Sequence, residues 1–256
     1  MSCNANPDPR SAHRTGPARA PKCVVTVVPA HDERDLLPRC LTALDAAARR
    51  CPVPVRTTVV LDACTDGTEA VIPEGVARID VRGRNVGAAR AAGFAASGCV
   101  GRDDVWFATT DADSVVPESW FVDQLVFWAD HDAMVGTVRV DWTHHTAATR
   151  SRYERRYRRR DGSVHGHVHG ANLGIRADVY GALGGFHAHA TGEDVDLVDR
   201  LQRAGHRIAW DEQSIVSTSD RRDPRAPGGF GQYLHSVAAA SGSSGLVVSA
   251  AAVEER

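Results

Sequence analysis

Lysine is nearly absent from this sequence, which has only Lys22 among 256 residues, so arginine carries almost all of the positive charge. The formal net charge is -2, whereas nucleic-acid-binding domains are usually strongly basic. The longest weakly apolar run, 245–253, is far shorter than the roughly 20 residues that a membrane-spanning helix needs. We therefore expect no nucleic-acid partner and no membrane span.

Cysteine pairs of the C-x-x-C type are also missing, because the six cysteines are scattered along the chain. This spacing excludes a zinc ribbon and a thioredoxin-type redox site. Disulfide frameworks are typical of short secreted chains, so we expect a chain of this length to keep its thiols reduced in the cytoplasm. Residues 1–21 lack the apolar stretch of a signal peptide and are expected to form a disordered tail.

What the sequence does contain is a regular alternation of apolar runs and helical patterns. The apolar runs predict strands at 24–29, 57–61, 76–81, 105–109 and 208–210. Helical spacing predicts helices at 36–50, 87–97 and 193–204, and Gly205 is placed to cap the last of them. Strands that alternate with helices indicate an α/β fold with a parallel sheet.

Acidic residues follow three of these predicted strands. They are Asp32 and Glu33, then Asp62 and Asp66, then Asp111 and Asp113. In an open parallel sheet, ligands bind at the carboxyl ends of the strands. One acidic loop would mean little, since polar loops follow strands in any case, but the recurrence predicts a ligand site at this edge.

Asp111 and Asp113 stand on one tight turn directly after a predicted buried strand. Two carboxylates so placed can hold a hard divalent cation, Mn²⁺ or Mg²⁺, which prefers oxygen ligands. Such a cation can bridge the phosphates of a nucleotide diphosphate and neutralise the charge of the leaving group. The D-x-D pattern is short and common, so it is weak evidence by itself.

An ordered set of motifs resembles family 2 of the glycosyltransferases over roughly residues 23–210. The donor motifs are Val27-Val28-Pro29-Ala30-His31-Asp32-Glu33-Arg34, Val59-Val60-Leu61-Asp62-Ala63-Cys64-Thr65-Asp66-Gly67-Thr68, Asn85-Val86-Gly87 with Arg90, and Asp111-Ala112-Asp113. The acceptor motifs are Gly170-Ala171-Asn172-Leu173, Gly184-Gly185-Phe186 and Gly192-Glu193-Asp194. The sequence departs from the family at Asp32, where an asparagine is usual. Several motifs in the family's order are far more specific than any one of them.

The resemblance implies a GT-A fold, in which a Rossmann-like, mostly parallel central sheet carries helices on both faces. One such domain would cover 22–220, with a donor half at about 22–115 and an acceptor half at about 116–220. The resemblance also implies a metal-dependent enzyme of hexosyltransferase type, which moves a sugar from a nucleotide-sugar donor to an acceptor hydroxyl. Direct displacement with Asp194 as general base would invert the anomeric centre, but related enzymes of this fold that retain configuration leave the stereochemistry open.

The residues carried over from the family's motifs form a donor group and an acceptor group. The donor group is Pro29, Ala30, His31, Glu33, Asp62, Arg84, Arg90, Asp111, Ala112 and Asp113, with Asp111 and Asp113 as the metal ligands. Asp62 would read the nucleotide base, and Glu33 would lie near the ribose. Arg84 and Arg90 either contact base or phosphate or lie on the surface. The acceptor group is His169, Gly170, Asn172 and Glu193. Glu193 would also orient the catalytic base Asp194.

The stretch 221–256 is expected to form a lid or a flexible tail. Arg221 and Arg222 precede a flexible Gly228-Gly229 pair and could fold over the donor diphosphate. In several relatives a histidine in this region adds a metal ligand. Here Ser217-Thr218-Ser219 occupies the neighbourhood, which puts that ligand in doubt.

Three features of the second half stay open. His165, His167 and His169 alternate and would share one face of a strand, as zinc ligands or beside the acceptor. His187 and His189 either border the acceptor or lie in a solvated loop. The run 150–160 places arginines on one helical face, which either attracts an anionic acceptor or a lipid surface or faces solvent.

Three other functions compete with the transferase. A nucleotidyltransferase of similar fold would need a glycine-rich first loop with Arg and Lys, which 29–33 is not. A catalytically inactive sugar-nucleotide-binding module is disfavoured by the intact Asp111, Asp113 and Asp194. An arginine-rich interaction protein would make the acidic strand ends coincidental. The acceptor is not identified, although a small soluble molecule is favoured over a lipid-linked one.

Overall fold

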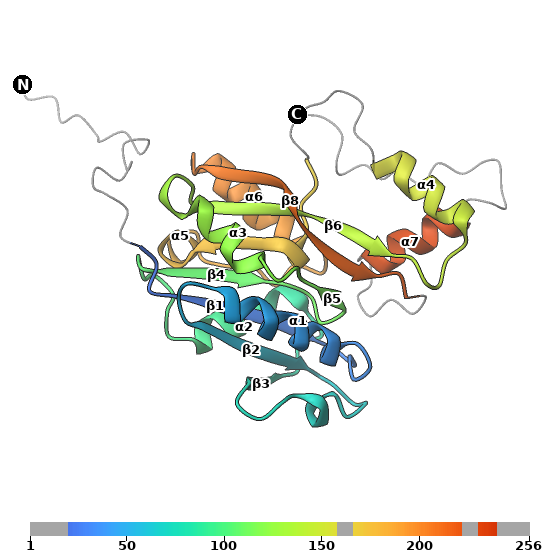
Figure 1. Ribbon diagram of the computed structural model, residues 1–256, viewed down its shortest axis with the longest axis horizontal. Helices are drawn as coiled ribbons and strands as arrows, with labels where there is room; N and C mark the ends of the chain where they lie inside the picture. The colour runs from blue at the N-terminus through green and yellow to red at the C-terminus, as the bar shows by residue number, and fades with distance from the viewer. Residues whose placement is uncertain (1–19, 158–165, 222–229, 240–256) are drawn as a thin grey trace, which may run out of the picture.

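The computed structural model describes residues 20–157, 166–221 and 230–239, which are built around a sheet of eight strands (Figure 1). The strands are β1 (Cys23–Ala30), β2 (Val55–Asp62), β3 (Ala77–Val81), β4 (Val105–Thr109), β5 (Ser114–Val115), β6 (Ala133–Asp141), β7 (Leu173–Arg176) and β8 (Ile208–Ser219). The α-helices are α1 (Leu37–Arg50), α2 (Val86–Ala96), α3 (Trp120–Val126), α4 (Ala147–Tyr157), α5 (Ala177–Ala182), α6 (Glu193–Arg203) and α7 (Phe230–Ala239). Short 3-10 turns are η2 (Thr68–Val71), η3 (Phe127–Ala129) and η4 (Gly170–Asn172).

The strand order β3-β2-β1-β4-β7-β6-β8-β5 places the functional loops on one edge of the sheet. Strands β1 to β4 are parallel, β7 is antiparallel to both β4 and β6, and β6 is parallel to β8. The first four strands, β6 and β8 therefore point the same way, and their carboxyl ends meet. Because β7 runs in the opposite direction, η4 just before it lies at the same edge.

Helices cover both faces of the sheet, each over its own apolar core. On one face α1 and α3 contribute Leu37 and Trp120, which are fully buried in one apolar cluster with Val24 and Val28 of β1. On the other face α2 and α6 contribute Phe94 and Leu197, and the Phe94 ring stacks on Phe107 of β4 with the centroids 4.4 Å apart. Full burial of one such side chain stabilises the fold by about 1.5–3 kcal/mol. The predicted α/β sheet with helices on both faces is confirmed.

The ends of α6 follow from its sequence. Gly192 stands at the N-cap with a φ of 75°, a left-handed conformation that favours glycine. Glu193 and Asp194 lie in the first turn, where the helix dipole stabilises negative charge. Arg203 lies in the last turn, and Gly205 has a φ of 78°, as expected for the predicted C-terminal cap.

Strand β8 is longer than the sequence predicts, since it continues for 12 residues to Ser219 rather than ending at Trp210. In its second part Asp211, Ser214 and Thr218 are buried. Polar residues that point inward remove the alternation of apolar and polar residues that identifies a strand. The extension carries the chain to the edge where the other parallel strands end.

Helices α4 and α7 pack against each other beyond the ends of β6 and β8 (Figure 1). The apolar cluster between them consists of Val140, Tyr153, Leu234 and Val237. Of the arginine-rich run 150–160, the part up to Tyr157 lies on α4, and the rest lies outside the described residues. Arg150 pairs with Glu154 at 2.7 Å on the same helix, which balances part of the run's charge.

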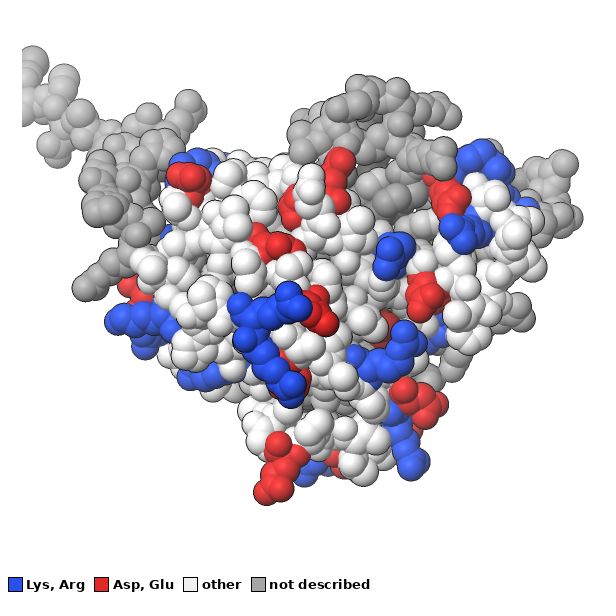
Figure 2. Space-filling view, in the orientation of Figure 1, with Lys and Arg blue, Asp and Glu red and all other residues white. Residues whose placement is uncertain are grey.

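The two predicted tails, 1–21 and 221–256, lie mostly outside the described residues, although the second contains Arg221 and α7. Among the residues that are described, there is no helix with the length and apolar character to cross a bilayer. On the face shown in Figure 2, basic and acidic side chains are interspersed.

Candidate active site

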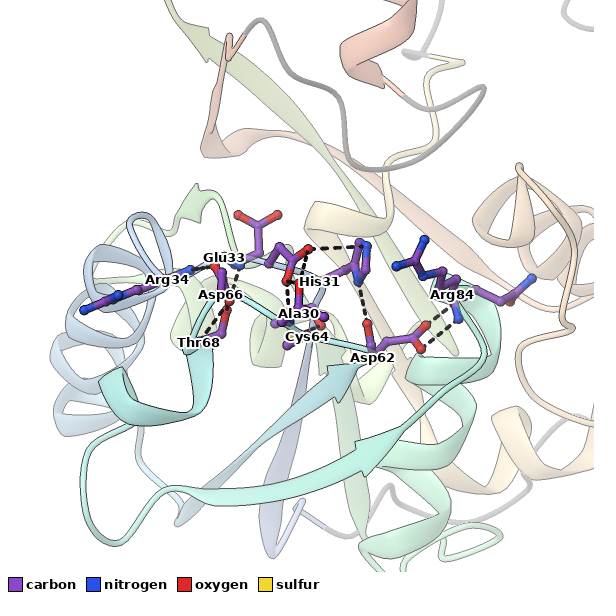
Figure 3. A network of polar contacts seen from close by, with 12 residues as sticks. Ala30, His31, Glu33, Arg34, Asp62, Cys64, Asp66, Thr68 and Arg84 are labelled. Atoms are coloured by element: carbon purple, nitrogen blue, oxygen red, sulfur yellow. Dashed lines mark hydrogen bonds and ion pairs between the residues drawn. The ribbon is translucent and has the colours of Figure 1, made fainter.

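The loops after β1 and β2 are joined by hydrogen bonds at the carboxyl edge of the sheet. The His31 ring points toward Asp62, and its Nδ1 lies 2.6 Å from the Asp62 carbonyl oxygen, so Nδ1 carries the proton (Figure 3). The Thr65 N–H donates to Asp32 Oδ1 over 2.6 Å. This backbone donor holds the pKa of Asp32 below its ordinary value. The two loops therefore form one surface, to which the donor motifs contribute most of the residues.

Asp62 lies buried at the end of β2, and each of its carboxylate oxygens accepts a backbone N–H. The donors are Arg84 over 2.8 Å and Asn85 over 2.7 Å. The Asn85 side chain in turn accepts the Ala88 N–H and caps α2. Because a carboxylate oxygen has more than one lone pair, Asp62 can still accept a hydrogen bond from a nucleobase.

Three non-glycine residues in these loops have positive φ angles. They are Asp32 at 53°, Ala63 at 53° and Arg84 at 45°. A left-handed conformation of this kind costs of order 1–3 kcal/mol at a non-glycine residue and clusters at functional sites. They lie in the loops that follow β1, β2 and β3, so the backbone at this edge is held in a conformation that non-glycine residues rarely adopt.

Arg90 on α2 connects the donor side of the edge to the acceptor side. Its side chain is 3% exposed, and its guanidinium pairs with Glu193 and lies 2.5 Å from Asp111 Oδ1. Its Nε donates to Thr109 Oγ1 over 3.2 Å. These partners surround the Arg90 guanidinium, and we propose that Arg90 positions the two carboxylates; its expected contact with base or phosphate stays a prediction. The sequence conceals this role because Glu193 lies 103 residues further along the chain.

Two glycines allow this close packing. A Cβ on Gly170 would overlap the Arg90 guanidinium, and a Cβ on Gly87 would overlap Glu193. The Gly170 N–H donates to Asp194 Oδ2 over 2.7 Å. Burial raises the pKa of Glu193 above its ordinary value, against the opposing effect of Arg90. The candidate base Asp194 and its neighbour thus belong to the same cluster as the D-x-D turn.

Asp113 is the carboxylate of the D-x-D turn that burial affects most, since burial raises its pKa to about 7. The Thr218 hydroxyl donates to its Oδ1 over 3.4 Å, and the Arg221 guanidinium lies 3.4 Å from its Oδ2. Asp111 adds a second negative charge beside it. The Ser114 hydroxyl also donates to Oδ1, over 3.3 Å, and the side chain is 17% exposed, so an ion can reach it. The all-oxygen pair of Asp111 and Asp113 fits Mn²⁺ or Mg²⁺.

We expect Mn²⁺ binding at pH 6 to release close to one proton. The raised pKa means that Asp113 is mostly protonated at this pH. Because this folded-state pKa lies above the unfolded-state value, the stability of the ligand-free fold falls as the pH rises toward 7. A cation needs the ionised form, so its affinity should rise with pH and level off above about pH 7. Calorimetry in two buffers of different ionisation enthalpy measures the released proton. The prediction is wrong if Asp113→Asn, which has no proton to lose, gives the same proton release.

Arg221 lies over the donor loop. Its two terminal nitrogens bind the Glu33 carboxylate at 2.5 and 2.6 Å, and the same guanidinium faces Asp113. Glu33 is buried, so this pair is held at the site rather than in solvent. The other predicted lid residue, Arg222, lies outside the described residues.

Asp220 is a buried residue that the sequence analysis does not single out. Its carboxylate accepts the consecutive backbone N–H groups of Thr143, His144 and His145 over 3.1, 2.8 and 3.0 Å. These donors hold its pKa well below the ordinary range, against burial. Asp220 thereby fixes the loop after β6, which lines a cavity of about 60 Å³ together with Asp113. A single aspartate after a strand carries no pattern by which sequence reasoning could find it.

Asn172, which the sequence motifs place at the acceptor site, is fully buried. Its oxygen accepts the Trp120 indole N–H over 2.9 Å, and its amide donates to the carbonyls of Thr137 and Ser214 over 2.9 and 2.8 Å. With both ends of the amide bonded inside the fold, Asn172 joins β6 and β8 rather than meeting a ligand. His169 is half-buried and faces Phe230 of α7, with the ring centroids 6.4 Å apart.

Three of the remaining expected residues lie at the ligand edge. Pro29 and Ala30 end β1, and Arg84 follows β3, at the ligand edge. Ala112 is buried in the core under α1, so only its main chain can face the site. His165 lies outside the described residues, whereas His167 and His169 stack with their centroids 6.2 Å apart.

A mostly parallel sheet with a two-carboxylate turn at its carboxyl edge defines a GT-A-like fold. The family description "Glycosyltransferase like family 2" matches residues 21–233. The chain therefore belongs to family 2 of the glycosyltransferases, which are transferases of glycosyl groups. The resemblance seen in the sequence motifs is confirmed.

Solved structures of the same fold are distant in sequence. A structure of Staphylococcus aureus TarS 1-349 in complex with UDP-GlcNAc is 13% identical, with a TM-score of 0.57, and the match covers 81% of this chain and 61% of TarS 1-349. The mannosyltransferase PcManGT from Pyrobaculum calidifontis, in complex with GDP-Man and Mn²⁺, is 18% identical with a TM-score of 0.60, covering 93% of this chain and 72% of that one. A search of curated proteins finds no match.

Proposed function

We propose that this protein transfers a sugar from a nucleotide-diphosphate sugar to an acceptor hydroxyl in a metal-dependent reaction. The observation that carries the proposal is the cluster around Arg90, which joins the D-x-D residue Asp111 to Glu193 beside Asp194. Donor chemistry and acceptor chemistry thereby meet at one edge of the sheet. The two related structures contain UDP-GlcNAc or GDP-Man with Mn²⁺, which supports a nucleotide-sugar donor and a divalent cation.

The donor would bind across the loops after β1 and β2. Asp62 accepts a hydrogen bond from the base, and the main chain at 29–31 borders it. When bound, Mn²⁺ or Mg²⁺ held by Asp111 and Asp113 would neutralise charge on the diphosphate leaving group. Arg221 supplies a further positive charge within reach of this position, because it already faces Asp113 and Glu33.

Asp194 takes the proton from the acceptor hydroxyl as that oxygen attacks the sugar. The Gly170 N–H orients its carboxylate, and Glu193 is held by Arg90, so the base has a fixed direction. A single base and a direct attack give inversion at the anomeric carbon. The acceptor would approach past His169, and we favour a small soluble acceptor over a lipid-linked one. The free thiols of the five described cysteines are in keeping with a cytoplasmic reaction.

A thermal-shift panel tests the donor site. We expect one of UDP, GDP, CDP and dTDP to raise the melting temperature only with Mn²⁺, and Asp113→Asn to abolish the shift. Saturation at a hundredfold the dissociation constant stabilises the native state by about 2.7 kcal/mol, which is measurable. Asp199→Asn, an exposed substitution on α6, is the matched control and should keep the shift. If no nucleotide binds under any metal condition, the proposed activity fails and an interaction protein becomes the better description.

A further inference from the structure

The loop between α5 and α6 carries two histidines that the proposed reaction does not use. His187 Nδ1 lies 3.1 Å and His189 Nε2 lies 3.5 Å from Oδ2 of Asp196, in the first turn of α6. One possible ligand atom from each of the three residues lies within 4.8 Å of the other two. Both histidine side chains are about half exposed, at 47% and 48%, so a solvated ion can reach them.

The chemistry of this set differs from that of the D-x-D turn. Two imidazoles and one carboxylate are ligands typical of zinc, whereas two carboxylates suit harder cations. Tetrahedral zinc with bonds of about 2.0–2.1 Å holds its ligand atoms about 3.3 Å apart. The two distances to Asp196 lie on either side of that value, and the two histidine nitrogens lie within 4.8 Å of each other, so side-chain rotations would have to bring them closer to close the site.

The backbone around the histidines is already fixed. The Asn85 side chain donates to the His189 carbonyl over 2.8 Å, and the His187 carbonyl packs so closely on Gly87 that a Cβ there would overlap it. The main chain thus holds both residues against the start of α2. A preformed arrangement of this kind lowers the entropy cost of binding an ion.

Arg200 opposes the ion by its charge. It donates to the same Oδ2 of Asp196 at 2.7 and 2.9 Å, and to the Leu183 and Gly185 carbonyls. An ion at this place would share the carboxylate with a guanidinium. We therefore expect an affinity below that of a closed structural zinc site, with a ligand position left for water.

We propose that His187, His189 and Asp196 form a zinc-class metal site, separate from the D-x-D turn, which clamps this loop to the first turn of α6. The loop leads directly into Glu193 and Asp194, so an ion here fixes the approach to the candidate base. The inference stands on these three side chains and does not depend on the proposed transferase activity.

The test is a Co²⁺ titration of the full chain followed by visible absorption, since tetrahedral Co²⁺ absorbs far more strongly than octahedral Co²⁺. An Asp111→Asn/Asp113→Asn background removes the hard-cation site. We expect one equivalent of tetrahedral Co²⁺, displaced by Zn²⁺. His187→Gln and His189→Gln should each weaken binding by about tenfold or more. Because both side chains are exposed, we expect these variants to fold, which circular dichroism melts confirm.

Two control variants make the result specific. His206→Gln removes a histidine whose Nδ1 lies 3.2 Å from Asp132, a single histidine–carboxylate pair elsewhere. His167→Gln alters another histidine pair, in which the His167 and His169 rings stack. Both should bind Co²⁺ as the parent does. The proposal is overturned if the spectrum shows only octahedral Co²⁺ or a thiolate charge-transfer band. It is also overturned if neither His187→Gln nor His189→Gln changes the titration, or if His167→Gln abolishes binding.

Discussion

Replacing Asp194 by asparagine is expected to lower kcat by about 10²–10⁴-fold, the range that a positioned general base supplies. The substitution keeps the size and shape of the side chain, and its amide oxygen can still accept the Gly170 N–H. What it removes is the ability to take a proton from the acceptor hydroxyl. The KM for the donor should change little, because the donor is bound on the other side of Arg90. Steady-state kinetics with the donor identified by the thermal-shift panel measure both constants.

The matched control for this experiment is Asp199→Asn on the same helix. The Asp199 side chain is 46% exposed and pairs with Arg203 of the same helix at 3.2 Å. Its loss should leave kcat within the error of the measurement. If Asp194→Asn retains full kcat while nucleotide binding is intact, Asp194 is not the base and the assignment is wrong.

Replacing Arg90 by methionine is expected to destabilise the fold by about 3–5 kcal/mol, because it leaves the buried Glu193 carboxylate without its partner. Glu193 is 5% exposed, so water cannot replace the lost guanidinium. We expect Mn²⁺-dependent nucleotide binding to weaken as well, since Asp111 loses the contact that orients it. Arg90→Lys should recover only part of the stability, because one ammonium cannot reproduce the geometry of a guanidinium. Urea unfolding followed by circular dichroism gives the free energies.

Arg203→Met supplies the comparison for Arg90. Arg203 is exposed and pairs with Asp199 one turn away, so its loss should be nearly silent in the same urea titration. If Arg90→Met unfolds at the same urea concentration as the wild type, the pairing of Arg90 with Glu193 does not stabilise the fold. The positioning role would then have to be abandoned.

The position of the acidic loops at one edge of the sheet could be predicted from the sequence, because each loop follows its strand within a few residues. Strand, turn and carboxylate follow one another within a few positions at Asp62 and at Asp111, so periodicity and spacing are enough to place them. The acceptor edge is different. Asn172 stands in an acceptor motif of the family, yet its amide is used inside the fold, because what surrounds a side chain depends on strands distant in the sequence.

The partners of Arg90 and Asp220 show the same limit. The sequence places Arg90 on an alanine-rich helix and predicts a donor contact, but no local pattern indicates that α6 packs against α2. Asp220 follows a stretch of strand whose inward residues are polar, so even the strand before it is hard to recognise. Long-range burial determines these roles, and a single sequence carries little information about it.

The pairing of Arg90 with Glu193, 103 residues apart, also constrains how this protein folds and evolves. The N-terminal segment cannot complete the cluster during synthesis, because α6 is made much later, and contacts of such long sequence separation form slowly. A chimaera that takes its acceptor half from a distant relative would have to keep a carboxylate facing α2. Otherwise Arg90 would keep Asp111 but lose its buried partner Glu193, and the graft would lose stability before its specificity could be tested.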